Sequence, residues 1–278
     1  MGAGAAEEFG FATADDRMRY VVQLLESRDG VTVGELARTF RVSEVTVRSD
    51  LTALARRGLI ARIRGGARAL QRGQSEIAFD VRLRVQEQPK RAIAAAAAAL
   101  VGEGEAIALD SSTTAFYIAQ QLRDKHELVV VTNGLRIAEE LADAPGVSVI
   151  VPGGVLRNAA MSLVGDFATP VLRSTRIRKG FFGARGISVE RGLMDLNPEE
   201  VRFKRELAEA CEQVVGVFDH TKWERSALLS FVTAERVGTI VTDERAPQNL
   251  LDEWRERKVH VVAAPLGDKE VPHTTLNS

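Results

Sequence analysis

The sequence predicts an α/β protein: an N-terminal winged helix-turn-helix domain followed by a C-terminal, mostly parallel α/β domain. Two short amphipathic helices and a basic hairpin near the N-terminus predict the first domain. Apolar runs alternating with helical segments after residue 105 predict the second. The chain has 278 residues and a net charge of −1, yet residues 17–72 hold twelve arginines and five acidic residues. This asymmetry indicates that one domain meets a polyanion and the other does not.

Composition excludes several classes of protein. Apolar residues make up 45% of the chain, which is normal for a globular protein. No apolar run approaches the roughly 20 residues that span a bilayer, and the acidic N-terminus lacks a signal-peptide pattern. The single cysteine, Cys211, excludes an intrachain disulfide and fits a reducing cytoplasm, where we expect the protein to act. The histidines are scattered, so we expect no metal and no cofactor.

The first domain is expected at residues 15–70, after a tail at 1–14. Thr32 is expected to cap a helix, with Glu35 completing a capping box. Ser43 is expected to cap the next helix, which Gly58 ends. Its expected buried stripe consists of Val45, Val47, Leu51 and Leu54.

Residues 59–64 alternate apolar and basic side chains, and the chain then turns at Gly65-Gly66, which predicts a small hairpin, or wing. In a helix-turn-helix, the N-terminal half of the second helix faces the base edges of DNA. Arg48 can pair with guanine or hold a phosphate, and Ser43 and Thr46 can reach phosphate oxygens. The predicted DNA-contacting residues are Thr32, Ser43, Glu44, Thr46, Val47, Arg48, Ser49, Arg62, Arg64 and Arg68.

Two alternatives stay open for this domain. Arg56 and Arg57 lie near a helix C-terminus, where compensation of the helix dipole explains them equally well. A winged helix can also bind protein, but the density of arginine favours DNA.

The second domain is expected at residues 89–265, between a polar linker at 71–88 and a tail at 266–278. Lys90 is expected to start a helix with a closely packed alanine run. The expected strands are continuously apolar, as in a parallel sheet covered on both faces. They are EAIALD, ELVVVTN, VSVIVPGG, KGFFGARG, QVVGVFD, VGTIVTD and KVHVVAAP, and the helices include TTAFYIAQQL, LRIAEELAD, PEEVRFKRELAEAC and NLLDEWRER.

Polar turns follow three successive strands, at the edge where open parallel sheets bind ligands. They are Ser111–Thr114, Thr132-Asn133-Gly134 and Pro152-Gly153-Gly154. Four hydroxyls at a helix N-terminus can form an anion site, although ordinary capping needs only one of them.

Further along the chain, Lys222 is a candidate cation for a phosphorylated ligand, and Asp219 can bind a sugar hydroxyl. A solvated surface lysine is the simpler alternative for Lys222. Glu199 and Glu200 open a helix, where acidic residues are favoured anyway, so a role in binding stays open. Cys211 is expected to be a small buried apolar residue.

These motifs resemble the DeoR family of bacterial repressors. The segment VSEVTVRSDLTALARRGLIARIRGGA is similar to that family's DNA-binding pattern, VSxxTIRRDLxxLexxGxLxRxHGGA. Matching motifs follow in the family's order: DSSTT at 110–114, VTN at 131–133, PGG at 152–154, VGD at 164–166, FFGARGI at 181–187, PEEVRFKR at 198–205, FDHTKW at 218–223 and TIVTD at 239–243.

The resemblance implies a regulator, usually a repressor, of a sugar-utilisation operon, associated with the nucleoid when bound to DNA. It implies a C-terminal domain similar to ribose-5-phosphate isomerase and CoA-transferase, sensing a phosphorylated sugar or related metabolite. Partners would be operator DNA and further copies of the chain, as a dimer or tetramer. With Glu200 and Asp219, the expected effector-binding residues are Asp110, Ser111, Ser112, Thr113, Thr114, Thr132, Asn133, Gly153, Gly154 and Lys222.

The chain departs from the family pattern at three positions. Ser49 stands where a second arginine is usual, and Arg64 replaces the usual histidine of the wing. Ser112 replaces the commoner glycine of the phosphate loop, which bears on which effector is bound.

Two other functions are compatible with the sheet. The chain could be a sugar-phosphate isomerase or transferase carrying a DNA-binding module, with Asp110, Glu200 or Asp219 as a base. The second domain could also serve oligomerisation alone. The basic module argues against an enzyme, and the three polar turns argue against a domain without a ligand, so we expect a regulator.

Overall fold

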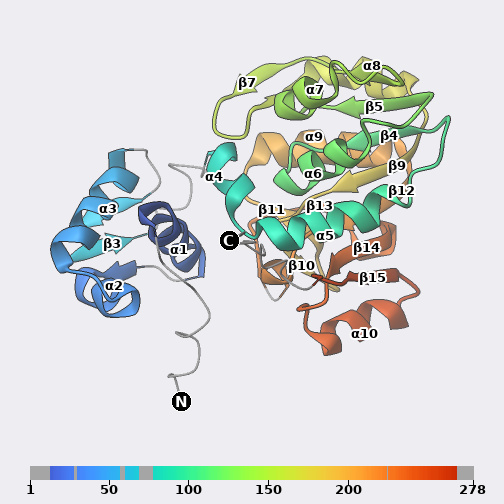
Figure 1. Cartoon of the computed structure of the whole chain (residues 1–278). Coiled ribbons are helices and arrows are strands. Elements are labelled where there is room, and N and C mark those ends of the chain that lie inside the picture. Colours follow the sequence, from blue (N-terminus) through green and yellow to red (C-terminus); the bar gives the residue numbers. More distant parts are fainter. Residues whose placement is uncertain (1–12, 28–29, 57–59, 69–77, 224, 268–278) are drawn as a thin grey trace, which may run out of the picture. The chain divides into compact units, whose positions relative to one another are not determined.

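The chain forms two compact units in the computed structural model (Figure 1). The first comprises Met1–Val85 with Asn158–Ala160, and the second comprises Gln86–Arg157 with Met161–Ser278. No helix in the described part of the chain is long and apolar enough to cross a membrane. The structure describes residues 13–27, 30–56, 60–68, 78–223 and 225–267.

The first unit confirms the predicted winged helix-turn-helix. Three of its helices pack beside a small antiparallel sheet in the order β1-β3-β2. The hairpin β2–β3 is the predicted wing, and β1 completes the sheet. The elements are α1 (Ala14–Ser27), β1 (Gly30–Thr32), α2 (Val33–Phe40), α3 (Glu44–Arg56), β2 (Ala61–Ile63) and β3 (Gly66–Arg68).

Both predicted helix caps are present. The Thr32 hydroxyl accepts a hydrogen bond from the Glu35 N–H at 3.1 Å, and the Ser43 hydroxyl accepts one from the Thr46 N–H at 3.1 Å. Each bond satisfies a backbone donor that the helix itself leaves without an acceptor. Gly58, expected to end α3, lies outside the described residues.

The expected core position of Val45 is wrong. Its side chain is 75% exposed, whereas Val47, Leu51 and Leu54 are almost fully buried. Two residues turn an α-helix by about 200°, so Val45 and Val47 cannot face the same core. The buried spacing from Val47 to Leu54 fixes the phase of α3 and turns Val45 outward.

A buried ion pair joins α1 to α3. Arg17 Nε lies 2.7 Å from one Asp50 oxygen, and Arg17 Nη2 lies 3.3 Å from the other. The two side chains are only 11% and 8% exposed. This fork-like pairing fixes the supporting helix against the helix expected to read DNA.

Part of the predicted linker is helical. The helix α4 (Phe79–Arg84) lies within it, and α5 (Glu87–Ala98) begins three residues before the expected start at Lys90. The alanine run packs closely as expected, because Ala94, Ala97 and Ala98 are buried.

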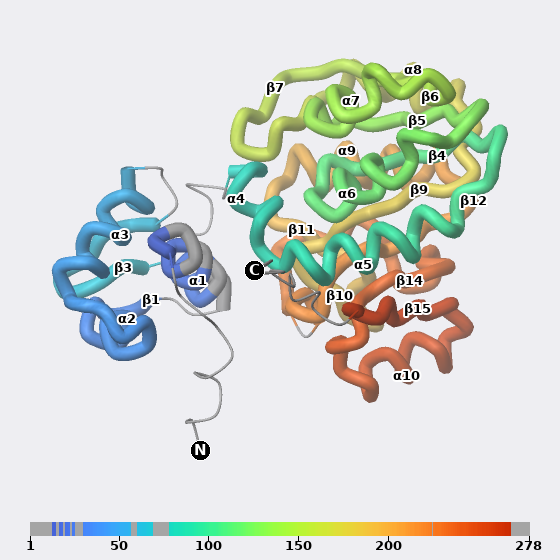
Figure 2. The backbone as a smooth tube through the Cα atoms, in the orientation of Figure 1, coloured from blue at the N-terminus to red at the C-terminus, as the bar shows by residue number. Residues whose placement is uncertain are grey.

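The second unit is built on a seven-stranded sheet in the order β15-β14-β12-β9-β4-β5-β6, with every neighbouring pair parallel (Figure 2). All seven strands predicted from apolar runs are confirmed. They are β4 (Ala106–Leu109), β5 (Leu128–Thr132), β6 (Val147–Ile150), β9 (Ile177–Phe182), β12 (Cys211–Val217), β14 (Val237–Asp243) and β15 (His260–Ala264).

Helices cover both faces of this sheet, and Figure 1 shows α5 and α6 in front of it and α9 behind. The core includes the fully buried Phe181, Phe182, Phe218 and Trp254. Cys211 is buried as expected, and burial raises the pKa of its thiol to about 12. The helices are α6 (Thr113–Gln121), α7 (Leu135–Leu141), α8 (Thr169–Ser174), α9 (Pro198–Glu209) and α10 (Gln248–Glu256), with short 3-10 turns η1 (Asp166–Ala168), η2 (His220–Lys222) and η3 (Ala234–Arg236).

Two small antiparallel additions were not predicted, because their short strands mix polar with apolar residues or contain glycine and form no continuous apolar run. The hairpin β7–β8 follows β6, and the sheet β10-β11-β13 joins two strands that follow β9 to one that follows β12. Gly154 precedes the hairpin with φ +138°, and a Cβ there would lie 2.5 Å from the Val164 carbonyl oxygen. Their bounds are β7 (Val155–Arg157), β8 (Ser162–Val164), β10 (Gly186–Ser188), β11 (Gly192–Asp195) and β13 (Leu229–Val232).

Candidate DNA-binding surface and ligand site

The solvent-facing side of α3 carries Glu44, Val45, Arg48 and Ser49, all exposed. Val47, expected to contact DNA, is 1% exposed and packs in the core of the first unit. The expected contact between Val47 and DNA is therefore wrong, because Val45 and not Val47 faces the solvent on this helix. We name Glu44, Val45, Arg48 and Ser49 the recognition face.

Arg48 forms an exposed ion pair with Glu44, which is easily broken. Its Nη2 lies 2.9 Å from Glu44 Oε2, one turn earlier, and both side chains are 55% exposed. Exposed pairs of this kind contribute little stability, so a guanine edge can replace the carboxylate. Ser43 and Thr46 share a hydrogen bond of 2.9 Å between their hydroxyls at the helix start.

The wing presents three arginines to solvent. Arg62 lies on β2, Arg64 in the turn and Arg68 on β3, and all three are exposed. The turn itself uses Gly65 with φ +83°, where a residue with a side chain would be strained. Exposed arginines can neutralise phosphates, so their contact with the DNA backbone stays a prediction.

Replacing Arg48 by alanine is expected to weaken operator binding by about 1–3 kcal/mol if Arg48 contacts a guanine edge. Fluorescence anisotropy with a labelled duplex measures this loss. Arg255→Ala, which removes an exposed charge from α10 in the second unit, is the matched control and should bind DNA like the unmodified protein. Unchanged affinity of Arg48→Ala would remove this side chain from base recognition.

In the second unit, the turns after β4, β5 and β9 converge at the carboxyl edge of the sheet. A Cβ on Gly134 would lie 3.2 Å from Ser111 Cα, and one on Gly183 would lie 2.4 Å from Ser112 Cβ. The two glycines therefore allow the neighbouring turns to close on the loop at residues 110–114. The predicted meeting of two of the three polar turns is present.

The loop at 110–114 leads directly into α6. Ser112 caps the helix by accepting a hydrogen bond from the Ala115 N–H at 3.2 Å. Capping thus accounts for one of the four hydroxyls. The helix supplies no acceptor for the N–H groups of Thr113 and Thr114, which lie in its first turn. Those groups, with Ser111, form an arrangement suited to an anion.

Asp110 holds this loop in place through its buried carboxylate. Its carboxylate is fully buried and accepts hydrogen bonds from the Ser112 N–H at 3.1 Å and the Gly183 N–H at 2.9 Å. Lys204 Nζ lies 3.0 Å away. With these partners, Asp110 fixes the shape of the loop, whereas the resemblance implied direct contact with the effector.

Lys204, on α9, was not predicted. It is 4% exposed, and its Nζ lies 2.7 Å from Asp195 Oδ2 and donates to the Gly183 carbonyl at 2.9 Å. Burial opposes its charge, but the carboxylates of Asp110 and Asp195 outweigh burial and raise the pKa of Lys204. The only sequence signal was its position four residues after Glu200, on the same face of one helix.

Glu200 lies within a second buried cluster. It is 4% exposed, accepts from Arg157 Nη1 at 2.7 Å and from the Ser111 hydroxyl at 3.3 Å, and also accepts from the Ser162 hydroxyl. Glu199 is exposed, so the helix-start explanation fits Glu199 alone. Arg157 and Ser162, from the unpredicted hairpin, were missed by sequence reasoning.

Thr132 and Asn133 are both fully buried at the end of β5. The Thr132 hydroxyl accepts from the Gly134 N–H at 3.0 Å. Asn133 Nδ2 donates to the Leu163 carbonyl at 3.1 Å, while its Oδ1 has no hydrogen-bond partner among the described residues. Gly153, with φ +89°, has open space where a side chain would lie.

Asp219 and Lys222 form a separate group after β12, two strands from β4. Asp219 is 1% exposed, accepts from the Thr221 N–H at 2.9 Å, and lies 4.0 Å from Lys222 Nζ. Burial raises the pKa of Asp219, but Lys222, Thr221 and Lys90 together hold it below its ordinary value. His220, beside them, bonds through Nδ1 to Asp243 at 2.9 Å.

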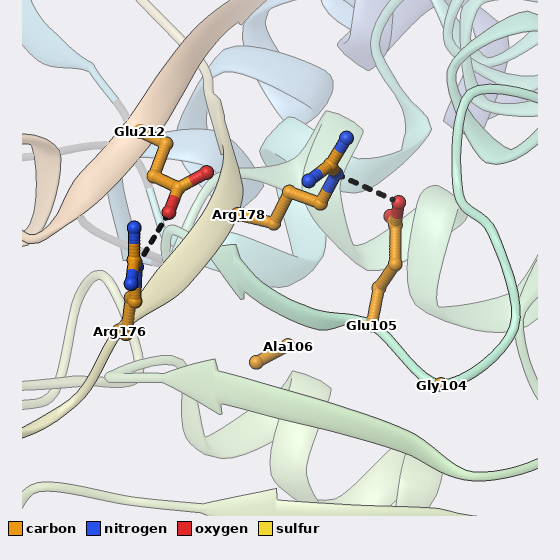
Figure 3. Close-up of a pocket in the computed structure, with 6 residues that line it drawn as sticks. All are labelled: Gly104, Glu105, Ala106, Arg176, Arg178 and Glu212. Carbon is orange, nitrogen blue, oxygen red and sulfur yellow. Dashed lines mark hydrogen bonds and ion pairs between the residues drawn. The ribbon is translucent and has the colours of Figure 1, made fainter.

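A different pocket lies at the opposite, amino-terminal edge of the sheet (Figure 3). It is an open hollow of about 460 Å³ lined by Gly104, Glu105, Ala106, Arg176, Arg178 and Glu212. Its charges are already matched, because Arg176 pairs with Glu212 at 2.7 Å and Arg178 with Glu105 at 3.3 Å. Ligands of open parallel sheets bind at the carboxyl edge, so we place the candidate ligand site there.

The Asp195–Lys204 pair predicts a pH dependence. Burial raises the pKa of Asp195, but Lys204 and Arg185 outweigh it and lower the pKa from 3.8 to about 2. A carboxyl group with a lowered pKa stabilises the fold above its unfolded pKa and loses that contribution as pH falls. Asp195→Asn should therefore cost about 2 kcal/mol at pH 6, with the gap closing between pH 4 and 2. Urea unfolding at each pH measures the gap, Asp252→Asn is the exposed control, and a pH-independent gap would contradict the assignment.

Family models match both units. The family model described as the DeoR-like helix-turn-helix domain matches residues 17–72, and the DeoR C terminal sensor domain matches residues 85–244. Among solved structures, ribose 5-phosphate isomerase from Plasmodium falciparum matches 48% of this chain and 52% of its own, with a TM-score of 0.37 and 13% identity.

Relatives along most of the chain are named regulators or repressors. The HTH-type transcriptional regulator GolR of Listeria innocua is 34% identical, covering 90% of this chain and 98% of its own. The putative aga operon transcriptional repressor of Escherichia coli O157:H7 is 32% identical, covering 89% and 93%. The glycerol-3-phosphate regulon repressor of Escherichia coli K12 is 30% identical, covering 83% and 91%.

These relatives are transcription factors, so the reading as an enzyme is not supported. The helix-turn-helix implies DNA as a partner, and the sensor domain implies a small-molecule effector. The matches extend over both units in the same order as in the relatives, and the chain belongs to the DeoR family of transcriptional regulators.

Proposed function

We propose that the protein represses genes for the use of a sugar and is controlled by a phosphorylated sugar or related metabolite. The effector site comprises the loop at 110–114, the end of β5 and the group around Lys222. The names of two relatives, which refer to the aga operon and the glycerol-3-phosphate regulon, support sugar metabolism as the target.

The observation that carries the proposal is the first turn of α6. It offers N–H groups and the helix dipole to an anion at the edge where three strands end. The buried Oδ1 of Asn133, without a partner among the described residues, requires a donor such as a sugar hydroxyl. A phosphate with an attached polyol satisfies both demands.

Control of DNA binding requires that the effector bind two states of the protein unequally. We propose a homo-oligomer whose recognition helices engage repeated operator half-sites. The effector then favours either the arrangement of recognition helices that fits those half-sites, which promotes DNA binding, or one that does not fit, which releases the DNA.

Lys222→Ala tests the assignment of the site. A panel of sugar phosphates is first screened by thermal shift, because a ligand of the folded state raises its melting temperature. We expect the responding compound to lose its effect on Lys222→Ala, while affinity for a duplex selected from random DNA is unchanged. Lys258→Ala, which removes an exposed lysine just after α10, is the control. A variant that responds at the same ligand concentration would refute the role of Lys222.

A further inference from the structure

Val45 is the most exposed large hydrophobic side chain in the described part of the chain, at 75%. It is the second residue of α3 and faces away from the core of the first unit. A β-branched residue there adds nothing to the core and is not a favoured helix former. Neither stability nor packing explains valine at this position.

The residues around Val45 on the surface of α3 are polar or charged. On the recognition face, Glu44 precedes Val45, Arg48 lies three residues on and Ser49 one turn on, all exposed. Every neighbour offers hydrogen bonds or charge, and Val45 offers only methyl groups. Val45 is therefore the one apolar side chain of the recognition face. It lies in the N-terminal half of α3, the part that faces base edges in a helix-turn-helix.

Base edges in the major groove offer one matching group. Adenine, guanine and cytosine present hydrogen-bond donors and acceptors there, whereas thymine adds a C5 methyl group. A valine cannot satisfy a base donor or acceptor, and burying such a group unpaired is unfavourable. Contact between Val45 and a thymine methyl removes apolar surface of both groups from water.

We propose that Val45 recognises a thymine 5-methyl group in the major groove, next to the base contacted by Arg48. The assignment rests on α3 entering the major groove, and it is independent of the effector. Sequence choice at that base pair then comes from apolar contact with Val45, and Arg48 supplies the neighbouring polar contact.

The test uses deoxyuridine, which lacks only the 5-methyl group of thymine. A high-affinity duplex is selected from random DNA with the unmodified protein, and each thymine is replaced singly by deoxyuridine. We expect one substitution within the half-site to weaken binding about 3- to 10-fold, the range for losing a buried methyl contact. Val45→Ala should bind the thymine and deoxyuridine duplexes equally at that position.

Leu228→Ala is the matched control, since it truncates a 66% exposed apolar side chain in the second unit. It should keep the full preference for thymine. Thermal unfolding of Val45→Ala should match that of the unmodified protein, because the side chain is outside the core.

The proposal is overturned if no single methyl deletion matters, or if the same deletion weakens Val45→Ala equally. A different result is expected if α3 does not contact bases at all. In that case, Arg48→Ala and Val45→Ala would both keep the sequence preference of the unmodified protein.

Discussion

Lys204→Met is expected to destabilise the second unit by about 3–5 kcal/mol, because it leaves two buried carboxylates without their cation. Asp110 is fully buried and Asp195 is 15% exposed at the side chain, and both lie within 3.0 Å of Lys204 Nζ. Methionine fills a similar volume, so the loss reports the missing charge and hydrogen bonds.

Urea unfolding followed by tryptophan fluorescence measures this effect selectively. The chain has two tryptophans, Trp223 and Trp254, and both lie in the second unit. Arg176→Met is the control, because its partner Glu212 is paired at the surface and the Arg176 side chain is 90% exposed. We expect that control to change stability by less than about 1 kcal/mol. A Lys204→Met variant within that margin would show that the buried cluster contributes no net stability.

Arg17→Met is expected to destabilise the first unit by a similar amount, about 3–5 kcal/mol. The change strands the Asp50 carboxylate at the junction of α1 and α3, where its side chain is 8% exposed. Some backbone amides of α3 exchange their hydrogen only when the whole unit unfolds. Their exchange rate should rise at least about a hundred-fold, because each 1.4 kcal/mol of lost stability corresponds to a factor of ten.

The double variant Arg17→Met with Asp50→Leu supplies the internal control. Removing both charges leaves no unpaired group, so much of the lost stability should return. Exchange in the second unit, monitored on α6, should stay unchanged in both variants. Unaltered exchange of α3 in Arg17→Met would mean that the pair is dispensable.

Much of the fold could be predicted because its signals are local. The seven strands of the parallel sheet are continuously apolar, since both faces are covered by helices. Thr32 and Ser43 cap their helices through residues three positions away. The hairpin β7–β8 and the sheet β10-β11-β13 lack such a signal, because their short strands form no continuous apolar run.

The phase of α3 could have been taken from residue spacing. In the segment VSEVTVRSDL, Val47 lies four residues before Leu51, on the same face of the helix, whereas Val45 lies six residues before it and about 120° around the helix. The structure accordingly buries Val47 and leaves Val45 exposed. The sequence-based set of DNA contacts thus included the buried valine and omitted the exposed one.

The ligand site was predictable in place but not in detail. Parallel strands all end at one edge, so the polar turns after β4 and β5 had to lie there. Lys204 looked like an ordinary helix lysine, and only the fold brings it between Asp110 and Asp195. Arg157 reaches Glu200 from a hairpin whose existence was not predicted.

The central claim is that a phosphorylated metabolite at the start of α6 controls DNA binding. Anisotropy titrations of the selected duplex, with matched pairs of free and phosphorylated sugars, test it most directly. We predict that at least one phosphorylated sugar changes DNA affinity by about 5- to 150-fold, the usual range of allosteric coupling, and that its free sugar does not. A sugar phosphate that raises the melting temperature but leaves DNA affinity unchanged, or a free sugar that acts equally well, would contradict the claim.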